Sequence, residues 1–540
     1  VGNAWARDLF DMENTTVTMR CMPVAKDKAI KRIDTAVMEL SGRTKRKASK
    51  TVESETHLET LGELLISLQN ENETLFDTTF IIEALGDTAA QEVKRTLQTN
   101  GFSYNSLTAR QKGGFVSSII ANHNAVKFST GMPSECIAAA FPFVSNAYID
   151  ANGLLIGEND MPVFFDPWKR DDDHVNSNMV IIGKTGSGKS YAAKTLLANL
   201  SAENSRIFVL DPESEYGTLA KHLGGKALDM SSSAGGIINP LQIMQTTSED
   251  DGRSSDYFAH LRFLEEFFKT VLKGIDSDSL ELLNNLVTEL YEKFGINENS
   301  DISKLSANAF PTFDDLGRLL DGKMTAKYEK VKAYLAKFFS GGRYSNIWNG
   351  HTNFKPHEHF ISFDFQALFA NKNTVVANGQ MLLLTKWIEN EIINNRKFNR
   401  TNTSDKHVIV AIDEAHLFID EKRPVALDFM FQLAKRIRKY SGMLMVITQS
   451  VKDLTGTPEI ARKSEAIIAA SQYSLIFNLS PNDMTDLCAL YDKAGKINEV
   501  EQYCITHNPR GAAFFITSPE SRTNFKIVAM PGVAAVIDKK

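Results

Sequence analysis

One eight-residue segment, GKTGSGKS at residues 183–190, restricts the possible folds of this chain more than any other feature. It matches the pattern GxxxxGK[ST] at every fixed position. An apolar run at 179–182 precedes it, and a helical pattern at 191–200 follows it. A strand, a glycine-rich turn and a helix in this order form a phosphate-binding loop, because the glycines let backbone N–H groups converge on an anion at a helix N-terminus. The sequence therefore predicts a nucleotide-binding α/β domain.

The residues of this loop have distinct predicted roles. Lys189 is expected to reach the β and γ phosphates, and the Ser190 hydroxyl is expected to ligate Mg²⁺. The expected ligands are therefore ATP and Mg²⁺. The whole loop is predicted to bind the nucleotide, namely Gly183, Lys184, Thr185, Gly186, Ser187, Gly188, Lys189 and Ser190.

A second segment, VIVAI at 408–412, reads as a buried strand that ends in Asp413 and Glu414. Asp413 is placed to hold Mg²⁺, and Glu414 to act as general base on the attacking water. Lys189 and Asp413 are 224 residues apart. Because a compact doubly wound core needs far fewer, we expect a large insertion, and the mostly helical stretch 241–400 is the candidate.

Gln449 and Arg438 complete the predicted catalytic set with Glu414. Gln449 follows the apolar run 443–447, and carboxyl ends of strands face the ligand in a doubly wound sheet. It is predicted to sense the γ-phosphate or orient water; the alternative is a solvated loop amide. Arg438 lies in a basic run near the end of a helix predicted at 426–440. The helix dipole alone favours cations there, so the alternatives are a terminal helix charge and an arginine finger that reaches a neighbouring subunit's nucleotide.

The predicted organisation has four parts. They are an N-terminal α/β domain at 1–148, a RecA-like core in two stretches at 149–240 and 401–540, and the helical insertion at 241–400. In the N-terminal domain, we predict strands at 15–21 and 78–85 and helices at 25–40, 53–68 and 88–99. The fold class is α/β.

Composition excludes some classes of protein. Hydrophobic residues make up 43% and charged residues 23% of the chain, which is typical of a globular protein. The net charge of −6 gives no global signature of nucleic-acid binding. The basic run at 43–50 is expected to be a solvated surface, the alternative being a phosphate-backbone contact.

The four scattered cysteines suggest a reducing compartment. No apolar run reaches the length of a transmembrane helix, no signal peptide opens the chain, and the first residue, Val1, suggests a fragment or a processed chain.

Five segments together resemble the FtsK–HerA superfamily of hexameric RecA-like motor ATPases. They are GKTGSGKS at 183–190, DPESEY at 211–216, VIVAIDEAH at 408–416, RKYSG at 438–442 and TQS at 448–450. The closer resemblance is to the large conserved ATPase of type IV secretion and bacterial conjugation systems. The tripeptide NPL at 239–241, IDEAH at 412–416, the long helical insertion and the N-terminal α/β domain support it.

Carried over by position, the resemblance implies phosphate and Mg²⁺ binding by Lys189 and Ser190, and Mg²⁺ binding by Asp413. It implies catalysis by Glu414 as base and Gln449 as sensor. Arg438 matches an arginine of the family, although Ser441 here stands between the aromatic residue and Gly442. The resemblance also places Asp211 and Glu215 near the active site, and Arg510 and Gly511 near the nucleotide.

The resemblance implies ATP hydrolysis in a hexameric ring at the inner face of the cell membrane. The protein would be cytoplasmic and peripheral, would dock on inner-membrane components of a secretion channel, and would power channel assembly or substrate movement. The main alternative is a DNA-translocating relative, either a coupling protein or a chromosome pump, and DNA therefore stays open as a partner. A third alternative is a structural component in which nucleotide only stabilises a ring.

Overall fold

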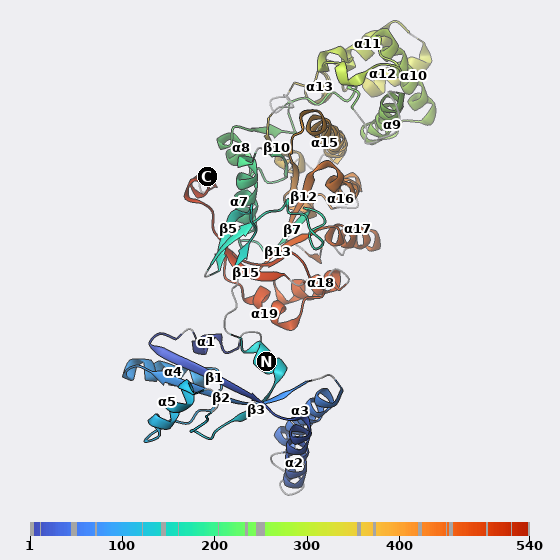
Figure 1. Ribbon diagram of the computed structural model, residues 1–540. Coiled ribbons are helices and arrows are strands. Elements are labelled where there is room, and N and C mark those ends of the chain that lie inside the picture. The colour runs from blue at the N-terminus through green and yellow to red at the C-terminus, as the bar shows by residue number, and fades with distance from the viewer. Residues whose placement is uncertain are drawn as a thin grey trace. The chain divides into compact units, whose positions relative to one another are not determined.

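The chain forms two compact units, Val1–Ser145 and Asn146–Lys540, each with its own sheet and hydrophobic clusters (Figure 1). The computed structural model describes residues 5–10, 12–44, 51–70, 73–120, 123–141, 147–159, 161–203, 205–232, 236–244, 254–323, 325–353, 358–370, 374–419, 424–449, 451–452, 457–492, 495–519 and 521–537. Most of the basic run at 43–50 lies outside these residues.

The first unit is built on an antiparallel sheet in the order β1-β2-β3. Its strands are β1 (Thr15–Pro23), β2 (Leu75–Ala84) and β3 (Thr130–Pro133). Its helices are α1 (Arg7–Phe10), α2 (Lys26–Thr44), α3 (Thr51–Asn70), α4 (Asp87–Thr99), α5 (Gln111–Ile119) and α6 (Ser134–Ala139). All five elements predicted in this region from its periodicity are present, with ends that differ by up to four residues.

The second unit is built on a 12-stranded sheet within its described residues. Seven neighbouring strands are parallel, in the order β13-β7-β12-β11-β8-β10-β9. They are β7 (Met179–Ile182), β8 (Arg206–Asp211), β9 (Lys226–Asp229), β10 (Phe360–Asp364), β11 (Val408–Ile412), β12 (Gly442–Thr448) and β13 (Tyr473–Phe477). The strand order reverses around β7, because the chain places later strands on both sides of it. Such a switch point is where open α/β sheets bind ligands.

An antiparallel extension continues the sheet beyond β13. It contains β14 (Ala512–Ile516), β15 (Arg522–Ile527) and the hairpin β5 (Leu154–Asn159) and β6 (Met161–Phe165). At the edge, β4 (Tyr148–Ile149) pairs parallel with β6. These strands do not belong to the parallel core.

Residues of the parallel strands alternate between two hydrophobic clusters, one on each face of the sheet. On β11, for example, Val408, Val410 and Ile412 belong to one cluster, and Ile409 and Ala411 to the other. Burial on both faces explains why these strands read as continuous apolar runs. One face is covered by α7 (Lys189–Ala202), α8 (Gly217–His222) and α20 (Pro531–Ile537). The other is covered by α15 (Thr374–Asn402), α16 (Pro424–Arg436) and α17 (Pro458–Ala469).

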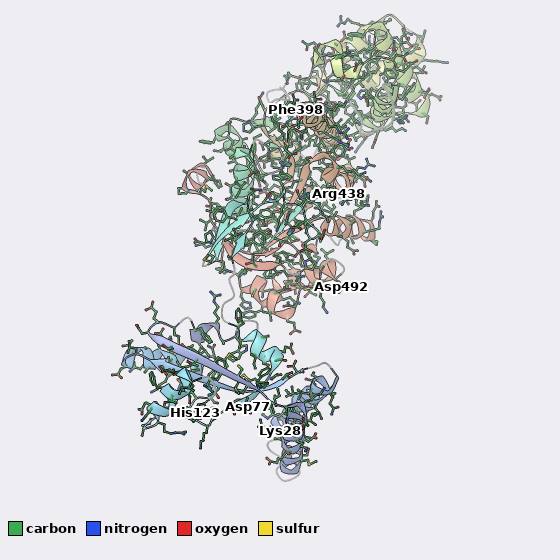
Figure 2. The ribbon with its side chains drawn as sticks, in the orientation of Figure 1. Lys28, Asp77, His123, Phe398, Arg438 and Asp492 are labelled. Carbon is green, nitrogen blue, oxygen red and sulfur yellow. The ribbon has the colours of Figure 1, made fainter. Side chains whose placement is uncertain are left out.

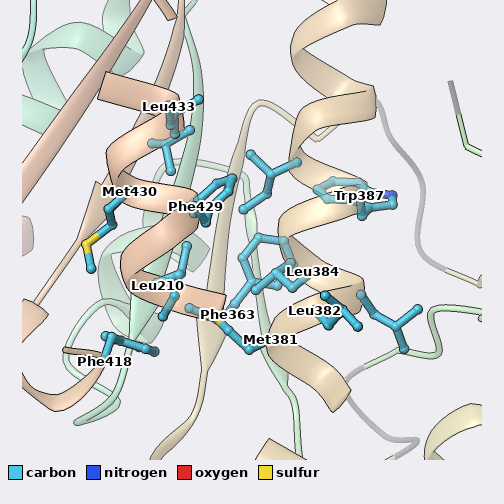
Figure 3. Packing of buried hydrophobic residues seen from close by; sticks show 14 of the residues in the cluster. Leu210, Phe363, Met381, Leu382, Leu384, Trp387, Phe418, Phe429, Met430 and Leu433 are labelled. Carbon is cyan, nitrogen blue, oxygen red and sulfur yellow. The ribbon is translucent and has the colours of Figure 1, made fainter. Parts of the chain in front are cut away.

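Figure 3 shows the packing of α15 and α16 on the second face. Met381, Leu384 and Trp387 of α15 approach Leu210 and Phe363 of the sheet. Full burial of a Leu or Phe side chain contributes about 1.5–3 kcal/mol, so these contacts fix α15 firmly to the core. The short helices α14 (Gln366–Ala370), α18 (Pro481–Tyr491) and α19 (Glu499–His507) complete this region.

A helical subdomain leaves the core after β9 and returns at β10. Its helices are α9 (Ser254–Val271), α10 (Ser277–Lys293), α11 (Phe313–Asp321), α12 (Ala326–Leu335) and α13 (Ser345–Trp348), with the 3₁₀ turns η2 (Ile302–Lys304) and η3 (Ala307–Ala309). The Trp348 indole N–H donates to Gln380 on α15, whose amide donates to the Met230 carbonyl. The subdomain is therefore tied to the core by buried hydrogen bonds.

The range predicted for this insertion, 241–400, is too long. It contains β10, which lies between β8 and β9 in the parallel sheet, and α15, which covers that sheet. The five-residue strand FISFD is short beside long helical patterns on both sides, so its period could not be distinguished. The helix predicted at 426–440 also differs, because α16 ends at Arg436 and a 3₁₀ turn, η5 (Ile437–Tyr440), follows.

Among the described residues, no helix is long and apolar enough to cross a membrane.

Candidate active site

The glycine-rich loop lies at the carboxyl end of β7, between the ends of β12 and β13. The Gly183 N–H donates to the Thr448 carbonyl at 3.4 Å, and the Lys184 N–H donates to the Asn478 carbonyl at 3.0 Å. The loop is thus held on both sides before α7 begins at Lys189. This places the N–H groups of the first turn of α7 at the switch point of the sheet, where an anion is favoured.

Two glycines of the loop adopt backbone angles that other residues rarely adopt. Gly186 has φ +75° and Gly188 has φ +118°. Gly183 is needed for a different reason, because a Cβ there would lie 2.5 Å from the Phe477 Cβ. The pattern of glycines in the sequence therefore reflects two left-handed positions and one close approach.

Lys189 is buried, with 5% of its surface exposed, and its ammonium donates to the Lys184 carbonyl at 3.3 Å. Burial lowers its pKa, and the nearby carboxylates of Glu414 and Asp413 act in the opposite direction. The ammonium therefore lies between the loop and the acidic pair at the end of β11.

Asp413 follows β11, and its N–H donates to the Leu210 carbonyl at the end of β8. The Asp413 carboxylate accepts the Glu414 N–H at 2.9 Å. Burial, and then the neighbouring charge of Glu414, raise the pKa of Asp413 to about 7. A buried carboxylate that retains a proton near neutrality is prepared to exchange that proton for a metal ion.

Glu414 has a left-handed backbone, with φ 41° and ψ 52°. A residue with a side chain adopts this conformation only at a cost of about 1–3 kcal/mol, and such strain concentrates at functional sites. Two hydrogen bonds hold this backbone in place. The Glu414 N–H donates to the Asp413 carboxylate, and the Leu417 N–H donates to the Glu414 carbonyl at 2.8 Å. One buried Glu414 carboxylate oxygen has no hydrogen bond among the described residues, although the His416 Nδ1 lies 3.1 Å away.

Asp211 and Glu215 belong to a turn at the carboxyl end of β8. Asp211 is buried and accepts the N–H groups of Glu215 and Tyr216 at 3.0 and 2.9 Å, and the Ser362 hydroxyl at 3.2 Å. Desolvation outweighs these bonds and raises its pKa. Glu215 pairs with Lys194 on α7 at 3.2 Å. Asp211 therefore shapes the turn, while Glu215 links it to the helix that begins at the loop.

Gln449 lies beside the loop. Its carboxamide oxygen accepts a hydrogen bond from the Thr185 hydroxyl, so the two predicted site residues touch. The following residue, Ser450, lies outside the described residues.

Arg438 does not lie beside the phosphate loop. It is exposed on η5, which precedes β12 (Figure 2). Within the described residues, no hydrogen bond or ion pair holds its guanidinium. Because β12 has seven residues, the amino and carboxyl ends of this strand are about 20 Å apart. Arg438 thus lies at the amino edge of the sheet, away from the loop of its own chain.

The C-terminal segment around Arg510 and Gly511, which the resemblance placed near the nucleotide, contacts the loop directly. The Gly511 N–H donates to the Ser187 carbonyl at 2.8 Å, and a Cβ on Gly188 would lie 3.1 Å from the Gly511 Cα. The exposed Arg510 is next in sequence to this contact. Asn478 was missed, because a single Asn without a motif carries no signal in one sequence, and His416 was given no role although it ends the segment IDEAH at 412–416.

The site fits a nucleotide with its metal ion. The Ser187 hydroxyl is buried with no hydrogen-bond partner among the described residues, as is one Glu414 oxygen. The loop supplies N–H groups and the Lys189 ammonium for phosphates. The Ser190 hydroxyl and the Asp413 carboxylate are the oxygen ligands that Mg²⁺ prefers. The fold and the site together define a RecA-like P-loop NTPase.

Comparison with known proteins leads to the same class of protein. The model of the TraG P-loop domain family matches residues 158–494, and the chain belongs to this family. VirB4 of Thermoanaerobacter pseudethanolicus is a structural match with a TM-score of 0.59 and 28% identity, covering 72% of this chain and 99% of that chain. The resemblance inferred from the motifs is confirmed.

Two more distant relatives are also similar. An uncharacterized protein of Bacillus anthracis is 20% identical over 575 residues, which cover 96% of this chain and 88% of that protein. The plasmid coupling protein TrwB in complex with ADP and Mg²⁺ has a TM-score of 0.42 and 13% identity, covering 71% of this chain and 90% of that chain.

Proposed function

We propose that this protein hydrolyses ATP with Mg²⁺ and that the hydrolysis powers a type IV secretion or conjugative transfer system, in pilus or channel assembly or in substrate transport. The observation that carries the proposal is the meeting of the phosphate loop, the Asp413–Glu414 pair and Gln449 at one edge of the sheet. Family membership and the similarity to VirB4 support the biological setting.

The proposed chemistry assigns each group a task. Lys189 and the loop N–H groups bind and orient the phosphates, and Mg²⁺ held by Ser190 and Asp413 would supply charge neutralisation. The free oxygen of Glu414 accepts the proton of the attacking water as general base. Gln449, held by Thr185, orients that water or contacts the γ-phosphate.

The proposed assembly is a homo-oligomer, with a hexameric ring as the expected form. Arg438 is consistent with this assembly, because its guanidinium is exposed at the amino edge, away from the loop of its own chain. In this proposal the ring is cytoplasmic, lies peripherally at the inner face of the cell membrane, and docks on inner-membrane components of the channel.

The test is Mg²⁺-dependent phosphate release from ATP by the full chain, together with particle size measured with and without a non-hydrolysable ATP analogue. We expect turnover and analogue-dependent assembly. Absence of both ATP binding and turnover would overturn the proposal. Strong stimulation by DNA would instead favour the alternative, a DNA-translocating motor of the same superfamily.

A further inference from the structure

A network of asparagine side chains joins the phosphate loop to the C-terminal segment. Asn478 follows β13, and its backbone carbonyl accepts the Lys184 N–H at 3.0 Å. Its side-chain amide donates to the carbonyls of Thr506 and Asn508, at 3.0 and 2.8 Å. One residue therefore holds the start of the loop with its main chain and the end of α19 with its side chain.

The same segment returns to the far end of the loop. Asn508 is buried and exchanges two side-chain hydrogen bonds with Asn524 on β15, at 2.9 and 2.8 Å. Three residues later, the Gly511 N–H donates to the Ser187 carbonyl at 2.8 Å. The contacts form a closed circuit from Lys184 through Asn478 and Asn508 to Ser187.

The circuit encloses the part of the loop that would contact phosphates. Within it, the Ser187 N–H donates to the Lys184 carbonyl at 3.2 Å, and the same carbonyl accepts the Lys189 ammonium. The hydrogen bonds of Lys184 with Asn478 and of Ser187 with Gly511 thus fix the residues at which the loop turns. A loop fixed before the ligand arrives loses less conformational freedom on binding.

We propose that Asn478 is a positioning residue that clamps the phosphate loop to the 506–511 segment and couples nucleotide binding to the order of α19. The proposal rests on the proposed binding of ATP at this loop. Since the coupling of two sites is reciprocal, occupation of the loop should protect α19, and loss of the clamp should loosen the loop. Asn478 acts through the loop and needs no contact with the nucleotide.

The test uses the full chain and the substitution Asn478→Asp, which keeps the size but directs carboxylate oxygen at two carbonyl oxygens. Hydrogen exchange of the nucleotide-free protein should accelerate in residues 183–190. The loss of two hydrogen bonds predicts that KM for ATP rises about tenfold, with kcat changed less than about threefold. Asn478→Ala should show the same direction of change.

Asn178 offers a matched control. It precedes β7 at the opposite edge of the sheet, is buried, and donates its amide to the carbonyls of Ala434 and Ala470 at 2.8 and 3.0 Å. Asn178→Asp should lower the melting temperature but leave loop exchange and KM near the wild-type values. If both variants lower the melting temperature and neither changes loop exchange, the clamp is structural only and the proposal is overturned.

The wild-type protein gives a test that needs no variant. The ATP analogue should slow exchange in residues 499–511 as well as in 183–190. Protection of 183–190 alone would overturn the coupling. A protein that binds ATP without this coupling refutes the clamp, whereas a protein that does not bind ATP refutes the proposed function. The exchange rates of the nucleotide-free variants test the clamp in either case.

Discussion

The two edges of the parallel sheet in the second unit differ in the burial of the predicted site residues that they carry. At the carboxyl edge, the ends of β7, β8, β11 and β12 bring charged groups together, and Lys189, Asp211 and Asp413 are all buried. At the amino edge, Arg438 is exposed. The turn that follows it is nevertheless fixed, since the Val408 N–H donates to the carbonyl of Ser441 at 3.3 Å.

The two edges therefore differ in what would complete them. At the carboxyl edge, the Ser187 hydroxyl and one Glu414 oxygen are buried without hydrogen-bond partners among the described residues, so a nucleotide bound by the same subunit would complete the site. At the amino edge, the Arg438 guanidinium is exposed to solvent beside a fixed turn, so a second subunit can contact it. Variants at the carboxyl edge should therefore act within their own subunit, and variants at the amino edge should act on a neighbour.

The largest effect is expected at Glu414. Glu414→Gln removes the base but keeps the shape, so ATP hydrolysis should fall by about 10³–10⁴-fold while ATP binding stays. Steady-state turnover and nucleotide titration measure the two quantities. Glu265→Gln on α9, an exposed carboxylate paired with Lys269, is the control and should be near wild type. Wild-type turnover of Glu414→Gln would remove this residue from its assigned role.

Arg438 tests the other edge. Arg438→Ala should lower the rate on the order of 10³-fold if the guanidinium acts as an arginine finger. Lys439→Ala, which removes the neighbouring exposed cation on the same turn, should have little effect.

Mixed subunits compare the edges directly. Arg438→Ala has an intact loop and Lys189→Ala has an intact Arg438, so their mixture should recover activity at those interfaces that combine the two intact halves. Turnover measured across mixing ratios should pass through a maximum. If no ratio restores activity, Arg438 does not act between subunits, and the proposed contrast between the edges fails.

The carboxyl edge was largely predictable from sequence, because each of its motifs follows a continuous apolar strand. The loop at 183–190 and the pair Asp413 and Glu414 are local patterns whose position at a strand end follows from the period of the sequence. The contact of Gln449 with Thr185 follows from the same rule, since carboxyl ends of parallel strands meet at one edge.

Other features depend on pairings that one sequence does not contain. The position of β10 between β8 and β9, and the contact of Gly511 with Ser187, join segments far apart in the chain. The left-handed backbone of Glu414 is also unexpected, because residues with side chains rarely adopt it. Hydrogen bonds with Asp413 and Leu417 hold it there, and no pattern in the sequence predicts this geometry.

Gln449 should have a smaller effect than Arg438. Gln449→Ala removes one positioned polar group near the reacting phosphate, for which a loss of about 10²-fold in kcat is expected. Thr185→Val removes only the hydroxyl that holds Gln449, so its loss should be smaller, about tenfold. If Thr185→Val lowers kcat and Gln449→Ala does not, the contact serves the loop alone and Gln449 is not a sensor.

The smallest effect is expected from the ionisation of Asp413. Its pKa is about 7 in the folded chain and about 4 in an unfolded chain. Between these values the folded state binds more protons, so stability falls as the pH rises from about 4 to about 7 and is then constant with respect to this group. The melting temperature of the nucleotide-free protein should therefore fall by several degrees more in the wild type than in Asp413→Asn over this range. Mg²⁺ with the ATP analogue should reduce the difference, because a metal ion replaces the proton. Equal pH profiles for the two proteins would show that Asp413 is ionised in the free site, and the carboxyl edge would then be less desolvated than its burial indicates.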